Sequence, residues 1–444
     1  MLNFVLIKSI SMSLGGIRGV LLAMTLGPAS FGLYGTLIAV QQYLSYLALG
    51  AREGVAIRLA RPDGTWDIAV IYSSALYWGV ASGTVCFLSI VSLTLAGAIP
   101  AEAVWIGLIG LCSIVNEILI NINRHENRLG KIAMIELGCN VIVLTIVLAL
   151  WTRITVAAAL QAVLLGTAVS AAIYLGTLRS FRWSAASMRM IRHLLNLGVR
   201  PALFSACLIA ANSIFVVAAG LMKLGDQTGF IAFGNSIVVM IFFGLNAASW
   251  GLASRAMQRL FAQSESAGAQ ADRSDVLFRF GVVAAVILAL GAQLAVQFVL
   301  TEYSQSAIYI LLLCLFQAYG VLLVNEFNYL NVHLRLKQVT AGYALLLLVI
   351  SVVSVTIDPS RYPMVIQIGV VLYFLLSLGV TASCARLGFR SGPYWHRVVW
   401  LLFPVSCTAF HAIAGSIGVL IACALGLMFG LCTHGTGRRV YDPL

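Results

Sequence analysis

The feature that most constrains the fold of this chain is a succession of about fourteen apolar stretches with little chain between them. A helix rises about 1.5 Å per residue, so a hydrocarbon core of about 30 Å is crossed by about 20 apolar residues. Backbone polar groups in lipid must pair within the protein, which leaves helices or a closed barrel. Long apolar runs without strict alternation exclude the barrel. The sequence therefore predicts an all-α polytopic membrane protein.

Composition indicates transport rather than catalysis. Of 444 residues, 61% are hydrophobic and only 9% are charged, so little chain remains for a soluble catalytic domain. The sequence shows no Ser/His/Asp order on loops, no carboxylates paired at catalytic spacing and no phosphate-binding glycine loop. Its nine cysteines fall in apolar stretches without a C-x-x-C pair, which predicts neither disulfides nor a bound metal.

Basic residues alternate between connections. The predicted helices are 4–25, 30–50, 69–97, 103–123, 132–151, 155–178, 197–221, 229–252, 276–299, 306–330, 339–357, 363–385, 398–412 and 415–433. Connections after even-numbered helices, with the C-terminal tail, hold 20 Lys and Arg residues, whereas those after odd-numbered helices hold three. This asymmetry places both termini in the cytoplasm. It also explains the net charge of +12 without nucleic acid.

Two sequence echoes suggest an internal duplication. Asn116-Glu117 in the fourth predicted helix matches Asn325-Glu326 in the tenth, six helices later. Leu26-Gly27 before the second helix matches Leu224-Gly225 before the eighth. An even offset keeps one orientation, as in a parallel repeat. We therefore expect six-helix bundles at 1–178 and 197–385, followed by an additional helix pair at 398–433, with twelve to fourteen spans in all.

The turn between the first two predicted helices carries a family resemblance. The segment Leu26-Gly27-Pro28-Ala29-Ser30-Phe31-Gly32-Leu33-Tyr34 resembles the LGP-x-x-FG-x-Y turn of Wzx-type polysaccharide flippases, in the MOP superfamily. The resemblance implies two six-helix bundles around a cationic cavity with alternating access. It also implies translocation of a lipid-linked oligosaccharide, typically on undecaprenyl diphosphate, across a bacterial inner membrane for polysaccharide or O-antigen synthesis. Membrane lipids and polysaccharide polymerase machinery are the partners that follow.

Arg18 is the deepest basic residue of the predicted spans. It lies about 14 residues into the first helix, roughly 21 Å from its inner end, and shares one helical face with Lys8, Ser11 and Gly15. An arginine near a helix centre costs about 2.5–3.5 kcal/mol on insertion scales, so it normally faces protein or water. The other candidate cavity residues are basic groups near cytoplasmic ends and amides suited to sugar hydroxyls: Arg52, Arg200, Arg255, Arg279, Asn212, Asn235 and Asn246.

Glu117, Glu136 and Glu326 are the only acids within the predicted spans. A buried carboxylate without a partner has a raised pKa and suits proton coupling, so Glu117 and Glu326, with Asn116 and Asn325 beside them, are candidates for proton or sodium coupling. The alternative is an ion pair with a basic residue such as Arg124 or Arg335. No other cofactor is indicated.

Other functions remain open from the sequence. A MATE-like cation-coupled multidrug antiporter would need an acidic cavity, whereas Arg18 is the deepest charge. A lipid II flippase would carry further arginines in its first span. A membrane glycan polymerase would carry a large outer catalytic loop, and an assembly scaffold would have no use for an intramembrane arginine.

Overall fold

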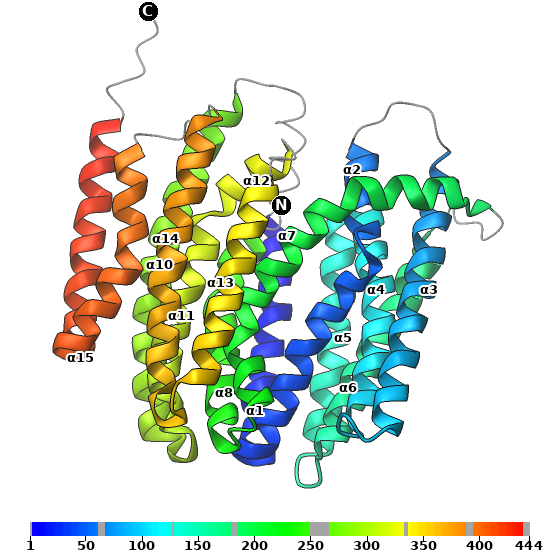
Figure 1. Cartoon of the computed structure of the whole chain (residues 1–444), viewed down its shortest axis with the longest axis horizontal. Helices are drawn as coiled ribbons and strands as arrows, with labels where there is room; N and C mark the ends of the chain where they lie inside the picture. The colour runs from blue at the N-terminus through cyan, green and yellow to red at the C-terminus, as the bar shows by residue number, and fades with distance from the viewer. Residues whose placement is uncertain are drawn as a thin grey trace, which may run out of the picture. The chain divides into compact units, whose positions relative to one another are not determined.

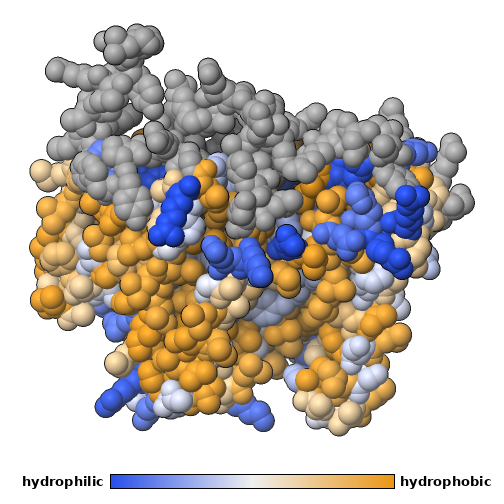
Figure 2. Space-filling model, turned by 45° about the horizontal axis from the view of Figure 1, so that its top comes forward, coloured by the Kyte–Doolittle hydropathy of each residue, from blue (hydrophilic) through white to orange (hydrophobic). Residues whose placement is uncertain are grey.

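The structure is a computed structural model, and it describes residues 2–60, 67–126, 128–178, 185–248, 266–332, 336–387 and 394–437. The chain divides into two compact units, Met1–Ser236 and Ile237–Leu444. In the described residues all regular secondary structure is helical, and ten helices are long and apolar enough to cross a membrane. Apolar side chains dominate the visible flanks of these helices, with hydrophilic residues near their ends (Figure 2).

Unit 1 is built from α1 to α7 and the part of α8 up to Ser236 (Figure 1). The bounds are α1 Leu2–Leu44, α2 Ala51–Ala60, α3 Ile68–Leu95, α4 Ala103–His125, α5 Leu129–Ala149, α6 Val156–Thr177, α7 Met188–Leu221 and α8 Asp226–Ile241. Helix α4 is the core of this unit, because it packs against α1, α2, α3 and α6. Asp67 and Thr155 cap α3 and α6 by accepting backbone N–H groups at 3.0 and 3.2 Å.

Helix α1 contains the turn that the sequence predicted. Gly27 has φ 71° and ψ 166°, outside the helical region, and Pro28 follows it. A glycine adopts this φ without steric cost, while a proline cannot continue the preceding helix because it has no N–H. Figure 1 shows α1 as two antiparallel arms joined at this point. The matching Gly225, between α7 and α8, also has a positive φ of 57°.

Several predicted bounds in unit 1 are wrong. The second arm of α1 ends at Leu44, a 3-10 turn covers Ser45–Ala48, and the residues expected to form a loop around Arg52 form helix α2. Helix α7 begins at Met188, nine residues before the predicted start at 197. These segments are too polar to read as spans, but they are helical because they pack on each other: α2 lies against α7.

Unit 2 contains α10 to α15. The bounds are α10 Ser266–Val299, α11 Ser306–Leu322, α12 Val324–Val332, α13 Lys337–Thr356, α14 Tyr362–Arg386 and α15 Tyr394–Gly437. Helix α11 is the core, since nearly all its residues are buried against α10, α14 and α15. In its surroundings the hydroxyls of Tyr343 and Tyr373 lie 2.7 Å apart and satisfy each other.

Unit 2 also differs from the predicted bounds. Helix α10 begins ten residues before the predicted 276, and the predicted helix 306–330 is interrupted at Leu323. The last two predicted helices correspond to the two arms of α15, which meet at Gly415 with φ 59° and ψ −145°. Figure 1 shows the two arms of α15 folded back on each other. The bundle limits 1–178, 197–385 and 398–433 stay a prediction.

Candidate functional site

The polar face predicted for the first helix contacts α5. Lys8 forms an ion pair with Glu136, and their side chains are 18% and 20% exposed. One turn further along, the amide of Asn140 donates to the hydroxyl of Ser11 at 2.9 Å. Glu136 was expected as either a lone acid or an ion-pair member, and the structure shows the ion pair. Lys8 is therefore neutralised by α5 rather than left as an isolated cation.

Arg18 differs from Lys8 because it has no acidic partner among the described residues. It is half-buried, its Nε is buried without a hydrogen-bond acceptor, and it makes no hydrogen bond or ion pair with any described residue. At the same spacing along α5, the positions after Asn140 are the buried Val143 and Val147, which offer no polar group. Arg18 thus retains a positive charge that no described acid balances within a membrane-spanning helix. Such a charge raises the free energy of membrane insertion unless an anion or water contacts it.

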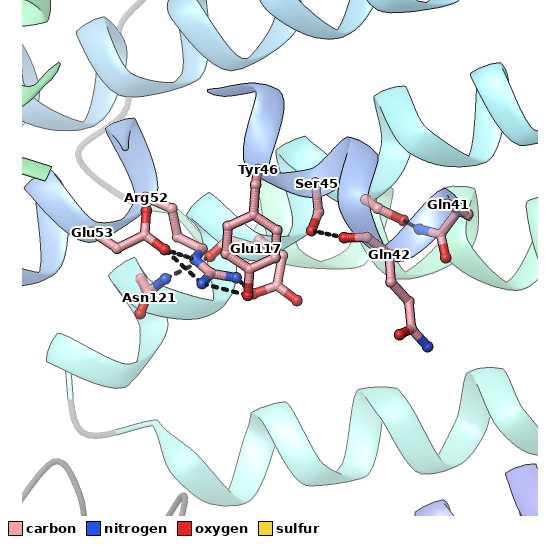
Figure 3. Close-up of polar contacts among 9 residues, drawn as sticks. Gln41, Gln42, Ser45, Tyr46, Arg52, Glu53, Glu117 and Asn121 are labelled. Carbon is pink, nitrogen blue, oxygen red and sulfur yellow. Dashed lines mark hydrogen bonds and ion pairs between the residues drawn. The ribbon is translucent and has the colours of Figure 1, made fainter. Parts of the chain in front are cut away.

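A second charged group surrounds Arg52 (Figure 3). The Arg52 guanidinium lies 2.5 Å from Glu53 and 3.2 Å from Glu117, and it also donates to the Tyr46 hydroxyl at 3.1 Å. Its Cζ lies 4.6 Å from the centroid of the Tyr46 ring. Burial by itself would lower the pKa of Arg52, but the attraction of Glu53, Tyr46 and Glu117 raises that pKa well above its usual value. Arg52 is therefore a permanent cation held by two carboxylates.

This arrangement corrects the partner expected for Glu117. The sequence suggested Arg124, two turns away in the same helix, whereas the structure pairs Glu117 with Arg52 of α2. Glu117 keeps 39% of its side chain exposed. Its backbone carbonyl accepts the amide of Asn121 at 3.0 Å, and Gln41 of α1 donates to Ser113 of α4 at 2.8 Å. Polar side chains from α1, α2 and α4 thus lie around the Glu117 carboxylate, which remains partly exposed.

Asn116 has a packing role in the structure. Its Nδ2 donates to the carbonyl of Thr167 at 2.9 Å and to the hydroxyl of Ser170 at 2.6 Å, both in α6. Amides that bridge helices in this way hold membrane bundles together. Asn116 therefore joins α4 to α6 instead of facing the Arg52 group.

Unit 2 holds a buried charge network of five residues. Arg397 of α15 lies 2.5 Å from Glu326 of α12 and 3.1 Å from Asp275 of α10. Asp275 also accepts from Asn325 and lies 3.3 Å from Arg279. The side chains of Arg397, Asp275 and Glu326 are 7%, 9% and 4% exposed. Two carboxylates and two guanidiniums make the network neutral as a whole.

Glu326 lies in α12, a nine-residue helix outside the candidate spans. Burial raises the pKa of Glu326 above its usual value, and the Asp275 charge adds to the rise, while Arg397 opposes both. One of its oxygens, Oε2, is buried without a hydrogen-bond partner. The partner expected from the sequence was Arg335, which lies outside the described residues, and the partner found is Arg397.

Sequence reasoning missed two members of this network. Asp275 and Arg397 each fall one residue outside a predicted helix, at 276 and 398, and so were counted as loop residues. The structure extends both helices and brings the two side chains together across 122 positions of sequence. The position of an acid and a base at the start of two apolar runs could have identified Asp275 and Arg397 as candidates. It could not have shown that they pair.

The remaining predicted residues are scattered. Asn212 and Asn235 are half-buried, while Asn246 and Arg200 are exposed. Arg255 lies outside the described residues. In the described part of the chain no three His, Cys, Asp or Glu side chains are grouped so as to hold a metal ion.

The fold is similar to that of solved MATE transporter structures. The chain is similar to the crystal structure of a eukaryotic MATE transporter, AtDTX14, with 12% identity, TM-score 0.63, and 90% of this chain and 96% of that chain covered. It is similar to a MATE in complex with MaL6, with 15% identity, TM-score 0.63, and coverage of 87% and 96%.

A third similar structure is an outward-facing conformation of a multidrug resistance MATE family transporter, with 16% identity, TM-score 0.51, and coverage of 87% and 96%. No protein-family model matches the sequence. No curated protein matches it either. At these identities the likeness establishes the fold.

Proposed function

We propose that this protein is a transporter that moves a lipid-linked oligosaccharide, of the undecaprenyl diphosphate type, across a bacterial inner membrane by alternating access. The observation that carries the proposal is the balance of charge among the described helices. Glu117, Glu136, Asp275 and Glu326 are each ion-paired with a basic side chain, whereas Arg18 has no acidic partner. The charge left over within a span is positive and suits an anionic cargo.

A diphosphate supplies the matching charge. The bilayer core does not solvate a diphosphate, so a cation must accompany it through the protein. A guanidinium offers two parallel N–H donors that fit phosphate oxygens, which is stronger than a point charge alone. In this proposal Arg18 meets the diphosphate, and the amides of Asn212 and Asn235 meet sugar hydroxyls.

Carboxylates are proposed to couple transport to an ion gradient. Glu117, with its exposed carboxylate, and Glu326, with its raised pKa, are the groups through which proton or sodium coupling would act. A polymerase that receives the glycan on the outer leaflet is the partner this cargo implies.

The test is transport by the purified protein in vesicles that contain the lipid-linked glycan. Arg18→Ala should fold normally, because removing an uncompensated charge relieves an insertion cost, but glycan reaching the opposite leaflet should fall at least tenfold. Arg18→Lys should retain part of the activity, because a charge remains without the two-donor geometry. The matched control is Arg153→Ala, which removes an exposed arginine from a connection between spans and should transport normally. Unchanged transport by Arg18→Ala at equal protein levels would refute the proposal.

A second candidate is a MATE-like multidrug antiporter, favoured by the 39% exposed carboxylate of Glu117. A cationic dye would then be the cargo, and a carboxylate would attract it. Vesicles that expel ethidium, with loss of expulsion in Glu117→Gln and normal expulsion in Arg18→Ala, would favour this function over the flippase.

A further inference from the structure

The first half of α7 lies differently from the other long helices of unit 1. Figure 1 shows it running across the end of the unit, beside α2, before α7 turns along the bundle. Pro201 lies within the helix and cannot donate the backbone hydrogen bond that a straight helix needs, which explains the change in direction.

One face of this segment is fixed to unit 1. Met190, Ile191 and Leu194 are buried, at 0%, 3% and 0% exposure. Gly198 of α7 approaches Gly50 so closely that a Cβ on Gly198 would lie 1.8 Å from the Gly50 carbonyl oxygen. The backbones of α2 and α7 are therefore in direct contact, and the orientation of the segment about its own axis is set.

The opposite face is exposed and carries both basic and apolar side chains. Arg189, Arg192, Asn196 and Arg200 are all exposed and are separated by three, four and four residues, so they form one stripe along the helix. The exposed apolar side chains of Met188, Val199 and Leu203, at 63%, 36% and 55% exposure, lie on the same face, because each is three or four residues from a member of this stripe.

Basic and apolar side chains on one exposed helix face suit the membrane interface. The apolar side chains enter the acyl boundary, and arginines reach headgroup phosphates at the same depth. A soluble phosphate ligand would satisfy the arginines but leave the apolar side chains in water. The mixed face therefore fits a lipid rather than a free anion.

We infer that the exposed face of α7 between Met188 and Leu203 binds the headgroups of anionic phospholipids. Arg192 and Arg200 hold the phosphates, and Met188, Val199 and Leu203 contact the acyl chains. The surface does not include Arg18, to which the proposed function assigns the cargo diphosphate. It holds α7 at the level of the headgroups. Helix α7 is in turn in close backbone contact with α2 through Gly198 and Gly54.

The test is a titration of the purified full chain, in detergent micelles, with phosphatidylglycerol. Binding is measured by native mass spectrometry and by the shift in Tm. Each arginine near an anionic surface contributes about 1 kcal/mol, about fivefold in affinity, so Arg192→Gln with Arg200→Gln should weaken phosphatidylglycerol binding about 30-fold. The matched control, Arg153→Gln with Lys223→Gln, removes two exposed basic residues of unit 1 from other connections and should bind like the wild type.

Two further arms separate the sources of phosphate. Inorganic diphosphate at the same concentration should neither raise the Tm nor displace phosphatidylglycerol. Leu203→Gln, which keeps every arginine, should weaken lipid binding and leave the response to salt unchanged. Equal phosphatidylglycerol binding by the Arg192/Arg200 variant and the control would overturn the proposal, as would displacement of the lipid by diphosphate.

Discussion

Gly198→Ala is expected to destabilise unit 1 because no space exists for one additional methyl group. A Cβ at this position would lie 1.8 Å from the Gly50 oxygen, 2.5 Å from the Gly54 nitrogen and 2.7 Å from the Gly50 carbonyl carbon. These three atoms are backbone, so a rotamer change cannot relieve the overlap. Two of these atoms, Gly54 N and Gly50 O, are also joined to each other by a hydrogen bond of 2.8 Å.

The size of the effect follows from two opposing contributions. Overpacking costs about 1–3 kcal/mol and more where nothing yields, and the upper end applies here because α2 and α7 must separate. Alanine regains about 1 kcal/mol of helix propensity over glycine. The net loss is then about 2 kcal/mol or more. For a unit of this size that corresponds to a fall in Tm of roughly 4–8 °C.

The assay is thermal unfolding in detergent, followed with a maleimide dye that becomes fluorescent when buried cysteines are exposed. Cys86 and Cys139 are buried reporters in unit 1. Gly138→Ala is the matched control, since a Cβ at Gly138 has no atom within 4 Å, and it should leave Tm unchanged or slightly higher. If Gly198→Ala and Gly138→Ala unfold at the same temperature, the close contact of α2 with α7 is refuted.

Two further predictions concern charge and sidedness. Arg397→Ala leaves Asp275 and Glu326 buried without their shared cation and should cost about 3–5 kcal/mol of folding stability. Burial already raises the pKa of Glu326, so its neutral form favours the folded state and the loss of stability should shrink as pH falls. A Tm deficit that grows at low pH would contradict the pairing. Single cysteines at Leu224 or Ser360 should react with an impermeant thiol reagent from outside intact cells, whereas one at Ala186 should not, and the reverse pattern would invert the predicted topology.

The sequence by itself determined that the chain is a bundle of membrane helices. That result needs no tertiary information, because each apolar run of about 20 residues in lipid must satisfy its own backbone hydrogen bonds. The turn at Gly27-Pro28 was likewise predictable, since a glycine of positive φ and a proline act locally. The position of Arg18 within a span was also predictable from the sequence, whereas the structure decided that no described acid pairs with it.

Only the tertiary structure decided which charges meet. Glu117 had Arg124 close by in its own helix, yet it pairs with Arg52, because helix rotation and the position of α2 determine which side chains face each other. Arg397 reaches Asp275 from 122 residues away. Local pattern also failed for α2 and the start of α7, whose composition is too polar for a span. These segments are helical because they bury a face on each other through Gly50, Gly54 and Gly198, and such packing depends on neighbours that the sequence does not name.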